Sequence, residues 1–253
     1  MARLVAAQRH AEILRRLEAV GGVRVEDLAA ALDVSGETIR RDLKGLAARG
    51  RLVVVHGGAV GAEEAEFAAR RADNPAGKRA IARRALDLAP DGASLLLDSG
   101  TTTLALAQAL ARAGRRLTVH TTSLPAAIAL ARAPGVVTHL IGGEFDPRDD
   151  ATRGEAAARA VAALAVDIAF VGVGGFDRDG AVTDYSRDAA RLRGLMLAAA
   201  RQAWFLADRG KFALSQNARV EGRAAGLVAD RPPPPALARA LKARGCRVLT
   251  PQR

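Results

Sequence analysis

A short stretch near the N-terminus gathers side chains of the types that proteins use to bind DNA. Within eight positions it holds Glu37, Thr38, Arg40, Arg41 and Lys44. Thr and Arg can reach base edges in the major groove, and Arg and Lys can neutralise phosphates. The alternative is an ordinary solvated helix face, on which Glu37 and Arg41 can form an ion pair. The charge pattern alone favours that alternative, so the choice depends on the elements that position these side chains.

The spacing of apolar residues predicts three helices around this stretch, separated by short turns. The first ends at residues 21–22, the second covers 25–32, and the third runs to about residue 48. A short helix, a turn and a capped helix in this order are typical of a helix-turn-helix, whose last helix enters the major groove. This context favours DNA binding over an ordinary solvated face.

The third helix has both a start signal and an apolar stripe. Ser35 is a suitable N-cap, because its hydroxyl can accept a free backbone N–H of the first turn. Ile39, Leu43 and Leu46 follow at helical spacing and predict the buried side. The polar residues then lie on the exposed side, and Ser35 joins them as a candidate DNA contact.

A β-branched run follows these helices. Residues 52–55 read Leu-Val-Val-Val and lead to a Gly-Gly pair, which predicts a strand and a turn. Behind three helices, such a strand forms a wing that lies along the DNA backbone. Arg51 and His56 flank the run and are expected to contact phosphate or the minor groove.

From residue 78 onward, helical stretches alternate with apolar strands. The strands are predicted at about 94–98, 117–121, 136–141, 168–171, 204–207, 226–229 and 248–249. The helical stretches are predicted at 78–89, 103–113, 125–132, 155–164, 188–202 and 236–244. Alternation of this kind predicts an α/β domain with a mostly parallel sheet covered by helices. We therefore expect a winged helix-turn-helix domain over 1–59, a partly helical linker over 60–77, and an α/β effector-binding domain over 78–253.

One strand end of the α/β domain is suited to an anion. The apolar strand ends at Asp98, and Ser99, Gly100, Thr101 and Thr102 open the next helix. Ligands of open α/β sheets bind at the carboxyl ends of strands, near helix N-termini. The glycine allows close approach, the hydroxyls can donate, and the helix dipole favours phosphate. A turn with no ligand is the alternative.

Three other strand ends carry similar residues and extend this candidate site. They are Thr121, Thr122 and Ser123; Gly142 and Gly143; and Asp208 with Lys211. A single glycine pair is usually a turn feature, but several at successive strand ends favour a shared site. Lys211 could complement the charge of a phosphate. The glycines at 172–175 lack the spacing of a dinucleotide site.

Composition excludes several other classes of site. The chain has 253 residues, of which 49% are apolar, so it can form a sizeable core. Its single cysteine cannot form an intramolecular disulfide, and the four histidines have no metal-ligand spacing. No apolar run is long enough for a membrane helix, and the N-terminus has no signal-peptide pattern. We expect a cytoplasmic protein with no metal, no cofactor and no membrane partner.

The net charge of +11 points to a polyanionic partner. The basic residues are mostly arginine in an alanine-rich chain, a bias that a GC-rich genome also produces. Most of the excess lies outside residues 1–56. The DNA-binding prediction therefore depends on where the arginines of the third helix lie, not on the total charge.

Two motifs together resemble the DeoR family of bacterial transcriptional repressors. One reads Val34-Ser35-x-x-Thr38-Ile39-Arg40-Arg41-Asp42-Leu43, and the other reads Asp98-Ser99-Gly100-Thr101-Thr102. Shorter matches lie at His56–Ala59, Lys78–Ala82, Ile141–Gly143, Asp167–Phe170 and Asp208–Phe212. The resemblance implies a winged helix-turn-helix and a sensor domain that resembles ribose-5-phosphate isomerase in fold. It also implies repression of carbohydrate-use operons, with release by a phosphorylated sugar.

Some positions depart from the family pattern, all in loops or helices expected to face the ligand. Thr122 stands where asparagine is usual, and Gly210 where serine is usual. The family tends to carry Glu and Lys where this chain has Ala189, Arg191 and Arg193. These departures concern the effector half of the chain, whereas the DNA half departs little.

Two readings of the function remain open. The first is a repressor that acts as a dimer or tetramer, because one recognition helix covers only a half-site. The second is a sugar-phosphate isomerase with a DNA-binding appendage, which needs a general base near the phosphate. Residues 189–193 offer no carboxylate after Asp188, and this favours a binding protein over an enzyme.

Overall fold

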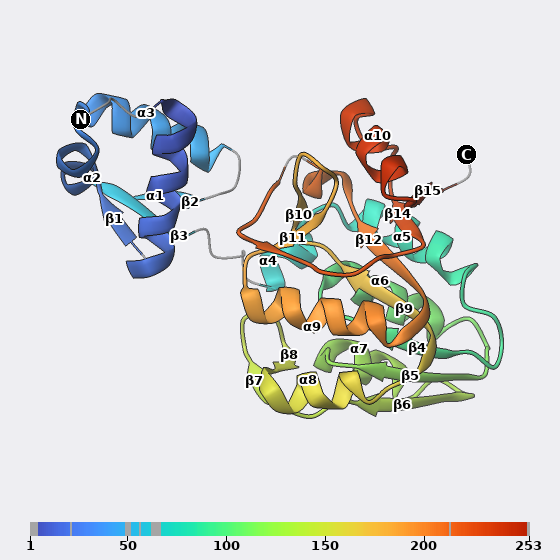
Figure 1. The fold of residues 1–253 in the computed structure, drawn as a ribbon. Helices are drawn as coiled ribbons and strands as arrows, with labels where there is room; N and C mark the ends of the chain where they lie inside the picture. Colours follow the sequence, from blue (N-terminus) through green and yellow to red (C-terminus); the bar gives the residue numbers. More distant parts are fainter. Residues whose placement is uncertain are drawn as a thin grey trace. The chain divides into compact units, whose positions relative to one another are not determined.

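The computed structural model describes residues 5–20, 22–48, 52–55, 57–61, 67–212 and 214–251. The chain divides into two units, 1–64 with 214–216 and 65–213 with 217–253. Figure 1 shows both, with the first in blue. Each unit is described by itself below.

The first unit is a helix-turn-helix with a small sheet. Its helices are α1 (Ala6–Val20), α2 (Val25–Leu32) and α3 (Gly36–Ala47), and its strands are β1 (Gly22–Arg24), β2 (Leu52–Val55) and β3 (Gly58–Gly61). The strands form an antiparallel sheet in the order β1-β3-β2. The predicted helices and wing are thereby confirmed, and β1 is an additional strand that the sequence pattern did not indicate.

The predicted apolar stripe of α3 forms the core of this unit. Ile39, Leu43 and Leu46 are buried against Ile13 and Leu28 of the other two helices. The cap is also as predicted, because the Thr38 amide donates to Ser35 Oγ at 3.2 Å. Burial of this stripe fixes which side of α3 faces outward.

The second unit is built on a seven-stranded parallel sheet in the order β15-β14-β12-β9-β4-β5-β6. Its strands are β4 (Ser94–Leu97), β5 (Leu117–Thr121), β6 (Val136–Leu140), β9 (Val166–Gly172), β12 (Ala200–Ala207), β14 (Gly226–Ala229) and β15 (Arg247–Leu249). The predicted parallel α/β fold is confirmed. Because parallel strands all end at the same edge, the predicted strand-end residues lie along one side of the sheet.

Helices cover both faces of this sheet. One face carries α5 (Pro75–Leu86), α6 (Thr101–Leu110) and α7 (Leu124–Leu130), and the other carries α8 (Gly154–Ala162), α9 (Arg187–Ala198) and α10 (Pro235–Ala243). Alternate residues of a central strand serve the two cores: Ile168 and Phe170 of β9 face the first set of helices, and Ala169 and Val171 the second.

Two element boundaries differ from prediction. Residues 199–202 were predicted to be helical, but β12 begins at Ala200, where it pairs with Val166 of β9. Neighbouring-strand pairing outweighs the helical propensity of this alanine-rich stretch. The helix predicted from residue 78 begins at Pro75, because Asn74 caps it by accepting from the Gly77 amide at 3.3 Å. A short helix, α4 (Phe67–Ala72), precedes it.

Several short elements project from the carboxyl edge of the sheet and were not predicted. The hairpin of β7 (Glu144–Asp146) and β8 (Ala151–Arg153) follows β6. A second small sheet contains β10 (Gly175–Phe176), β11 (Val182–Asp184) and β13 (Ala218–Arg219), and the 3-10 turn η1 (Arg209–Lys211) follows β12. No helix in the described part of the chain combines the length and apolar character needed to cross a bilayer.

Candidate functional site

The outer side of α3 presents most of the predicted DNA contacts to solvent. Glu37, Arg40, Arg41 and Lys44 are exposed, and Thr38 is half-buried. Arg40 forms an ion pair with Glu37 at 3.6 Å. Arg41 and Lys44 have no ion-pair partner among the described residues, so their charges are available to phosphates or bases. Ser35, at the start of the helix, is also exposed. The remaining two predicted contacts, at positions 51 and 56, lie outside the described residues.

A buried carboxylate holds α3 to α1. Asp42 Oδ2 accepts from Arg9 Nε at 2.6 Å, and its Oδ1 contacts Arg9 Nη2 at 3.1 Å and His10 Nε2 at 3.0 Å. Burial raises the pKa of Asp42, but the Arg9 and His10 contacts outweigh it and leave that pKa lowered. Asp42 therefore stays ionised and fixes the orientation of the outward-facing side of α3. The sequence signal for this role was a charged residue, Asp42, directly before Leu43 of the apolar stripe.

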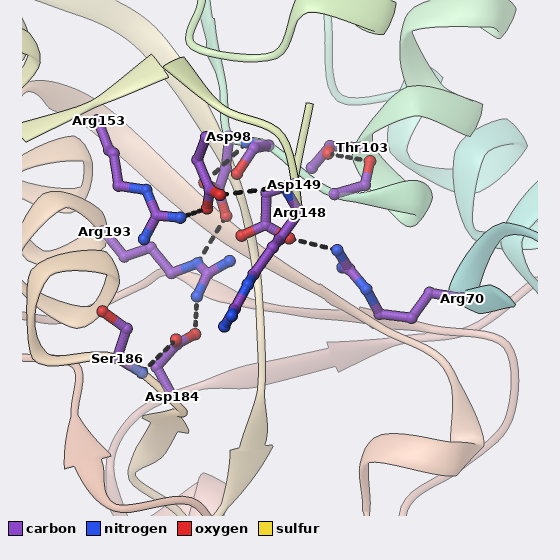
Figure 2. A network of polar contacts seen from close by, with 12 residues as sticks. Arg70, Asp98, Thr103, Arg148, Asp149, Arg153, Asp184, Ser186 and Arg193 are labelled. Carbon is purple, nitrogen blue, oxygen red and sulfur yellow. Dashed lines mark hydrogen bonds and ion pairs between the residues drawn. The ribbon is translucent and has the colours of Figure 1, made fainter. Parts of the chain in front are cut away.

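In the second unit, the Asp98 carboxylate is occupied within the protein. Asp98 Oδ1 accepts from the Ser99 amide at 2.8 Å, and Oδ2 accepts from the Gly172 amide and Arg193 Nε at 2.9 and 2.7 Å. Arg193 of α9 also pairs with Asp184 of β11 (Figure 2). Asp98 thus joins β4, β9 and α9 at the sheet edge and orders the loop that begins at Ser99.

Further arginine–aspartate pairs surround this point. Arg153 of β8 pairs with Asp146 of β7. Arg70 of α4 pairs with Asp149, which lies in the loop between β7 and β8 (Figure 2). Arg153, Asp146 and Asp149 of these pairs, together with Arg193, border a small recess at the carboxyl edge. The recess is lined by Asp98, Ser99, Asp146, Asp149, Ala151, Thr152, Arg153, Ala189, Leu192 and Arg193.

The sequence prediction missed Arg70, Arg153 and Arg193 as members of this site. Arg193 stood out as a departure from a family pattern, but nothing in the local sequence connects it with Asp98, 95 positions away. Arg153 lies in a three-residue strand, too short for periodicity to reveal it.

The predicted anion loop leads into a helix without a side-chain cap. Gly100 is the N-cap of α6 at φ 130°, and no side chain of the described residues bonds there to the free N–H groups. By contrast, Asn74, Ser123 and Ser186 cap α5, α7 and α9. Thr103 Oγ1 instead donates to the Gly100 carbonyl at 2.9 Å. The first turn of α6 is thus left with donors that can bind an anion.

The residues after β5 are fully buried. The Ser123 amide donates to Thr121 Oγ1 at 3.0 Å, and Ser123 Oγ accepts from the Ala126 amide at 3.3 Å. These two hydroxyls therefore serve the turn itself. Thr122 Oγ1 has no hydrogen-bond partner among the described residues, although it is buried. A buried hydroxyl without a partner is unfavourable unless a ligand or water satisfies it.

The two glycines after β6 differ from these buried residues in their exposure to solvent. Gly142 and Gly143 are both exposed. Gly143 has φ 150°, and a Cβ there would lie 2.5 Å from the Arg153 carbonyl oxygen. The close approach of β7 to β8 thus requires a glycine at 143 on packing grounds alone.

A buried lysine lies near the end of β12. Lys78 Nζ donates to the Asp73 carbonyl at 2.6 Å and to the Arg70 carbonyl. Burial lowers the pKa of Lys78, the charges of Asp208 and Asp73 oppose this, and Lys211 adds to it. Lys78 and Lys211 therefore place two ammonium groups within electrostatic reach of each other and of buried Asp208. Lys78 appeared in the sequence only as part of a motif, not as a predicted site residue.

No metal centre is formed by these groups. Among the described residues, no three His, Cys, Asp or Glu side chains are arranged to hold a metal ion. The polar groups at this edge include free N–H groups, hydroxyls and cationic side chains, which are the types of group that bind anions.

Family comparisons match both units. The model of the DeoR-like helix-turn-helix domain matches residues 9–65. The model of the DeoR C terminal sensor domain matches residues 73–223.

Curated relatives align over most of the chain. The Glycerol-3-phosphate regulon repressor of Haemophilus influenzae is 34% identical over 207 residues, which cover 81% of this chain and 80% of that protein. The HTH-type transcriptional repressor CsqR of Escherichia coli is 30% identical over 249 residues, which cover 96% of this chain and 95% of its own.

Among solved structures, ribose 5-phosphate isomerase A from Neisseria gonorrhoeae aligns with a TM-score of 0.40 at 16% identity. The alignment covers 53% of this chain and 52% of the isomerase. A likeness this weak carries no inference about activity.

Proposed function

The chain belongs to the DeoR family of helix-turn-helix transcriptional regulators, and we propose that it represses carbohydrate-metabolism genes until a phosphorylated sugar releases it from its operator. The alignment with a glycerol-3-phosphate regulon repressor, which covers 81% of this chain, supports the sugar-phosphate class of effector. The single observation that carries the DNA-binding half is the solvent-facing side of α3, where Arg41 and Lys44 have no ion-pair partner among the described residues.

On this proposal, α3 of the domain over 1–59 enters the major groove. Thr38 and Arg41 read base edges, whereas Arg40 and Lys44 contact phosphates. Ser35 and Glu37 line the entry of the helix, and Arg51 and His56 contribute from the wing. The buried bond of Asp42 with Arg9 keeps α3 in one orientation, so little ordering is needed on binding.

A gel-shift titration at fixed salt tests the DNA-binding surface. Arg41→Ala is expected to weaken operator binding at least tenfold, since a lost base contact costs about 1–3 kcal/mol. Arg15→Ala is the matched control, because Arg15 is on α1 and is engaged by Glu12 at 2.7 Å. Equal affinity of Arg41→Ala and wild type, with unchanged thermal stability, would exclude α3 as the recognition helix.

The effector is proposed to bind at the carboxyl edge of the large sheet. Its phosphate occupies the uncapped first turn of α6, from Ser99 to Thr102, with Lys211 supplying positive charge. The other residues predicted for this site surround the ligand on this proposal. They are Asp98, Thr121, Thr122, Ser123, Gly142, Gly143 and Asp208. The sugar hydroxyls extend toward the recess bordered by Arg153 and Arg193. The partnerless hydroxyl of buried Thr122 supports a polar occupant there.

Release from DNA requires that the ligand prefer one conformation over another. The Arg70–Asp149 pair is the proposed point of coupling, because Asp149 lines the recess and Arg70 belongs to α4. Asp149 is less buried than Asp98 or Asp146. A ligand anion can therefore displace Asp149 from Arg70 at a lower desolvation cost than it could displace Asp98 or Asp146 from their arginines. In sequence, α4 is the first described helix after the helix-turn-helix unit, which makes it the proposed route of coupling.

A thermal-shift screen against phosphorylated and free sugars tests the effector site. A binder raises the midpoint by mass action, and the response is expected only from phosphorylated sugars. Lys211→Met is expected to remove the shift, whereas Lys242→Met on α10 keeps it as a control. If no phosphorylated sugar changes the midpoint, the effector proposal is wrong.

A second function, sugar-phosphate isomerisation, is less well supported. Catalysis needs a carboxylate poised to take a proton. The Asp98 carboxylate is bonded to two amides and Arg193, and Asp208 accepts from the Gly210 amide at 2.8 Å. Incubation with ribose 5-phosphate decides between the two. Turnover that disappears in Lys211→Ala would establish the enzyme.

A further inference from the structure

A second cavity of the large unit lies beside the C-terminal end of α10. Its volume is about 500 Å³, which falls in the range of small-molecule sites, about 300–1,000 Å³. Residues 222–224, which precede β14, and residues 243–246, which precede β15, form part of its lining. Parallel strands begin at the same edge, so these residues lie at the amino edge of the sheet. We call this space the α10 cavity, and it shares no lining residue with the recess at the carboxyl edge.

Small residues leave the α10 cavity open. Ala224 and Ala243 line it with side chains that are too short to fill it. Close packing holds its border, because a Cβ at Gly180 would lie 3.0 Å from the Ala240 Cβ of α10. The cavity is therefore built into the packing of α10 against the turn that holds Gly180.

The floor of the α10 cavity is apolar. Val182, Phe205, Val220 and Leu241 line it, and each belongs to the core with less than a tenth of its surface exposed. None of these side chains donates or accepts a hydrogen bond. A sugar placed on this floor would lose hydrogen bonds to water without replacement. A hydrocarbon group is the occupant that such a floor favours.

Positive charge lies at the rim of the same cavity. Arg223 and Arg244 both line it, both are exposed, and neither forms an ion pair within the described chain. The Arg244 charge opposes the rise in the pKa of Cys246 that burial causes, so this guanidinium lies within electrostatic reach of a thiol that also lines the cavity. No carboxylate is among the lining residues. Two arginines without acidic partners are suited to a carboxylate or a phosphate, which accept paired N–H bonds.

Backbone donors add to this charge. The amides of residues 222–224 make no hydrogen bond within the described chain. The amides of Val220 and Ala225, by contrast, donate to the carbonyls of Val182 and Ala203. Backbone N–H groups require a partner, and those of residues 222–224 are available to the oxygens of an anion.

We propose that the α10 cavity binds a small organic anion with a hydrocarbon body. Arg223, Arg244 and the amides of residues 222–224 hold its carboxylate or phosphate, and the hydrocarbon part packs on Phe205 and Leu241. This site goes beyond the proposed function, because a sugar phosphate has the anionic group but not the hydrocarbon body. The chain then carries two anion sites of different selectivity, one at each edge of the large sheet.

Calorimetric titration of the full chain tests this selectivity. The probes are octanoate and octyl phosphate, used below the concentrations at which they form micelles. Each control lacks one part of the ligand: acetate and inorganic phosphate lack the hydrocarbon body, and 1-octanol lacks the charge. The better of the two probes is expected to bind at least tenfold more tightly than any control, and its identity shows which anionic group the cavity prefers. A control that binds as tightly as the probes, or no binding of either probe, would overturn the proposal.

Variants locate the binding. Arg244→Met is expected to weaken binding of the better probe by roughly tenfold or more, because it removes a charged hydrogen-bond donor. Arg239→Met is the matched control, since Arg239 is an exposed arginine of α10 that does not line the cavity. Ala243→Trp fills the cavity and is expected to abolish binding while both arginines remain.

Arg223→Met provides a second reading if Arg244→Met does not fold, because Arg223 lies in the loop before β14. It is expected to weaken binding to a similar extent. If the folded arginine variants at 223 and 244 bind the probe as tightly as Arg239→Met, the anion is not held in the α10 cavity. The same conclusion follows if Ala243→Trp binds as the wild type does.

Discussion

Replacing Arg193 by methionine would remove the cation that joins two buried aspartates at the carboxyl edge of the sheet. The side chains of Arg193 and Asp98 are only 9% and 3% exposed. Arg193 donates to Asp98 at 2.7 Å and also pairs with Asp184. Methionine retains much of the aliphatic stem but no charge. The variant therefore leaves two carboxylates in a site that water reaches poorly.

The magnitude follows from burial. Removing one partner of a buried ion pair costs about 3–5 kcal/mol, because the remaining charge is left uncompensated. Asp98 retains the Ser99 and Gly172 amides, so we expect a loss near the lower end, about 3 kcal/mol. For a unit of this size, about 2–4 °C of melting temperature corresponds to each kcal/mol. The variant is therefore expected to melt roughly 6 °C or more below the wild type.

Arg191→Met on the same helix provides a matched control. Arg191 pairs with Glu155 at 2.7 Å, but these side chains are 58% and 55% exposed. An exposed pair is worth about 0–1 kcal/mol, so this variant should barely change stability. Urea denaturation of both variants, followed by circular dichroism, gives the comparison. If Arg193→Met loses no more stability than Arg191→Met, the assignment of Asp98 to a structural network is wrong.

Three further predictions concern titratable groups. The Arg9 and His10 contacts lower the pKa of Asp42, so the stability that Asp42 contributes is present above about pH 4, its unfolded pKa, and is lost at lower pH. The protection of the amides of residues 36–47 against hydrogen exchange, relative to the intrinsic rate at each pH, should therefore fall in that range, and in Asp42→Ala it should be low already at pH 7. Burial and the neighbouring His139 lower the pKa of His120. The unfolded chain therefore binds the proton first, and stability falls as pH drops below about 6.5. His139→Gln should reduce that fall between pH 7.5 and 5.5 in urea titrations, and an identical dependence of stability on pH in the variant and the wild type would contradict the coupling. Burial raises the pKa of the Cys246 thiol to about 11, so iodoacetamide at pH 8 should label the native protein far more slowly than the urea-unfolded chain.

The sequence could predict what depends on local periodicity. The apolar spacing of Ile39, Leu43 and Leu46 in α3 is sufficient to identify the buried side, and Ser35 marks the start of the helix. The central strands β4, β9 and β14 were predictable for a similar reason, since a strand buried on both faces reads as a continuous apolar run. The start of β12 was not, because Ala200 belongs to the sheet only through its pairing with Val166, 34 positions earlier.

The candidate effector site shows why ligand contacts are harder to predict than helices. An aspartate at a strand end reads as a ligand group, yet Asp98 has its carboxylate bonded by groups from β9 and α9 that no local pattern connects with it. The same folding that occupies Asp98 brings Arg153, Arg193 and Lys78 to this edge and leaves the first turn of α6 uncapped. Asp98 is therefore better understood as a group that positions the N–H donors of the loop than as a group that contacts the ligand. A sequence motif of this kind indicates where a site is, whereas burial and partner geometry decide which of its atoms remain free to bind.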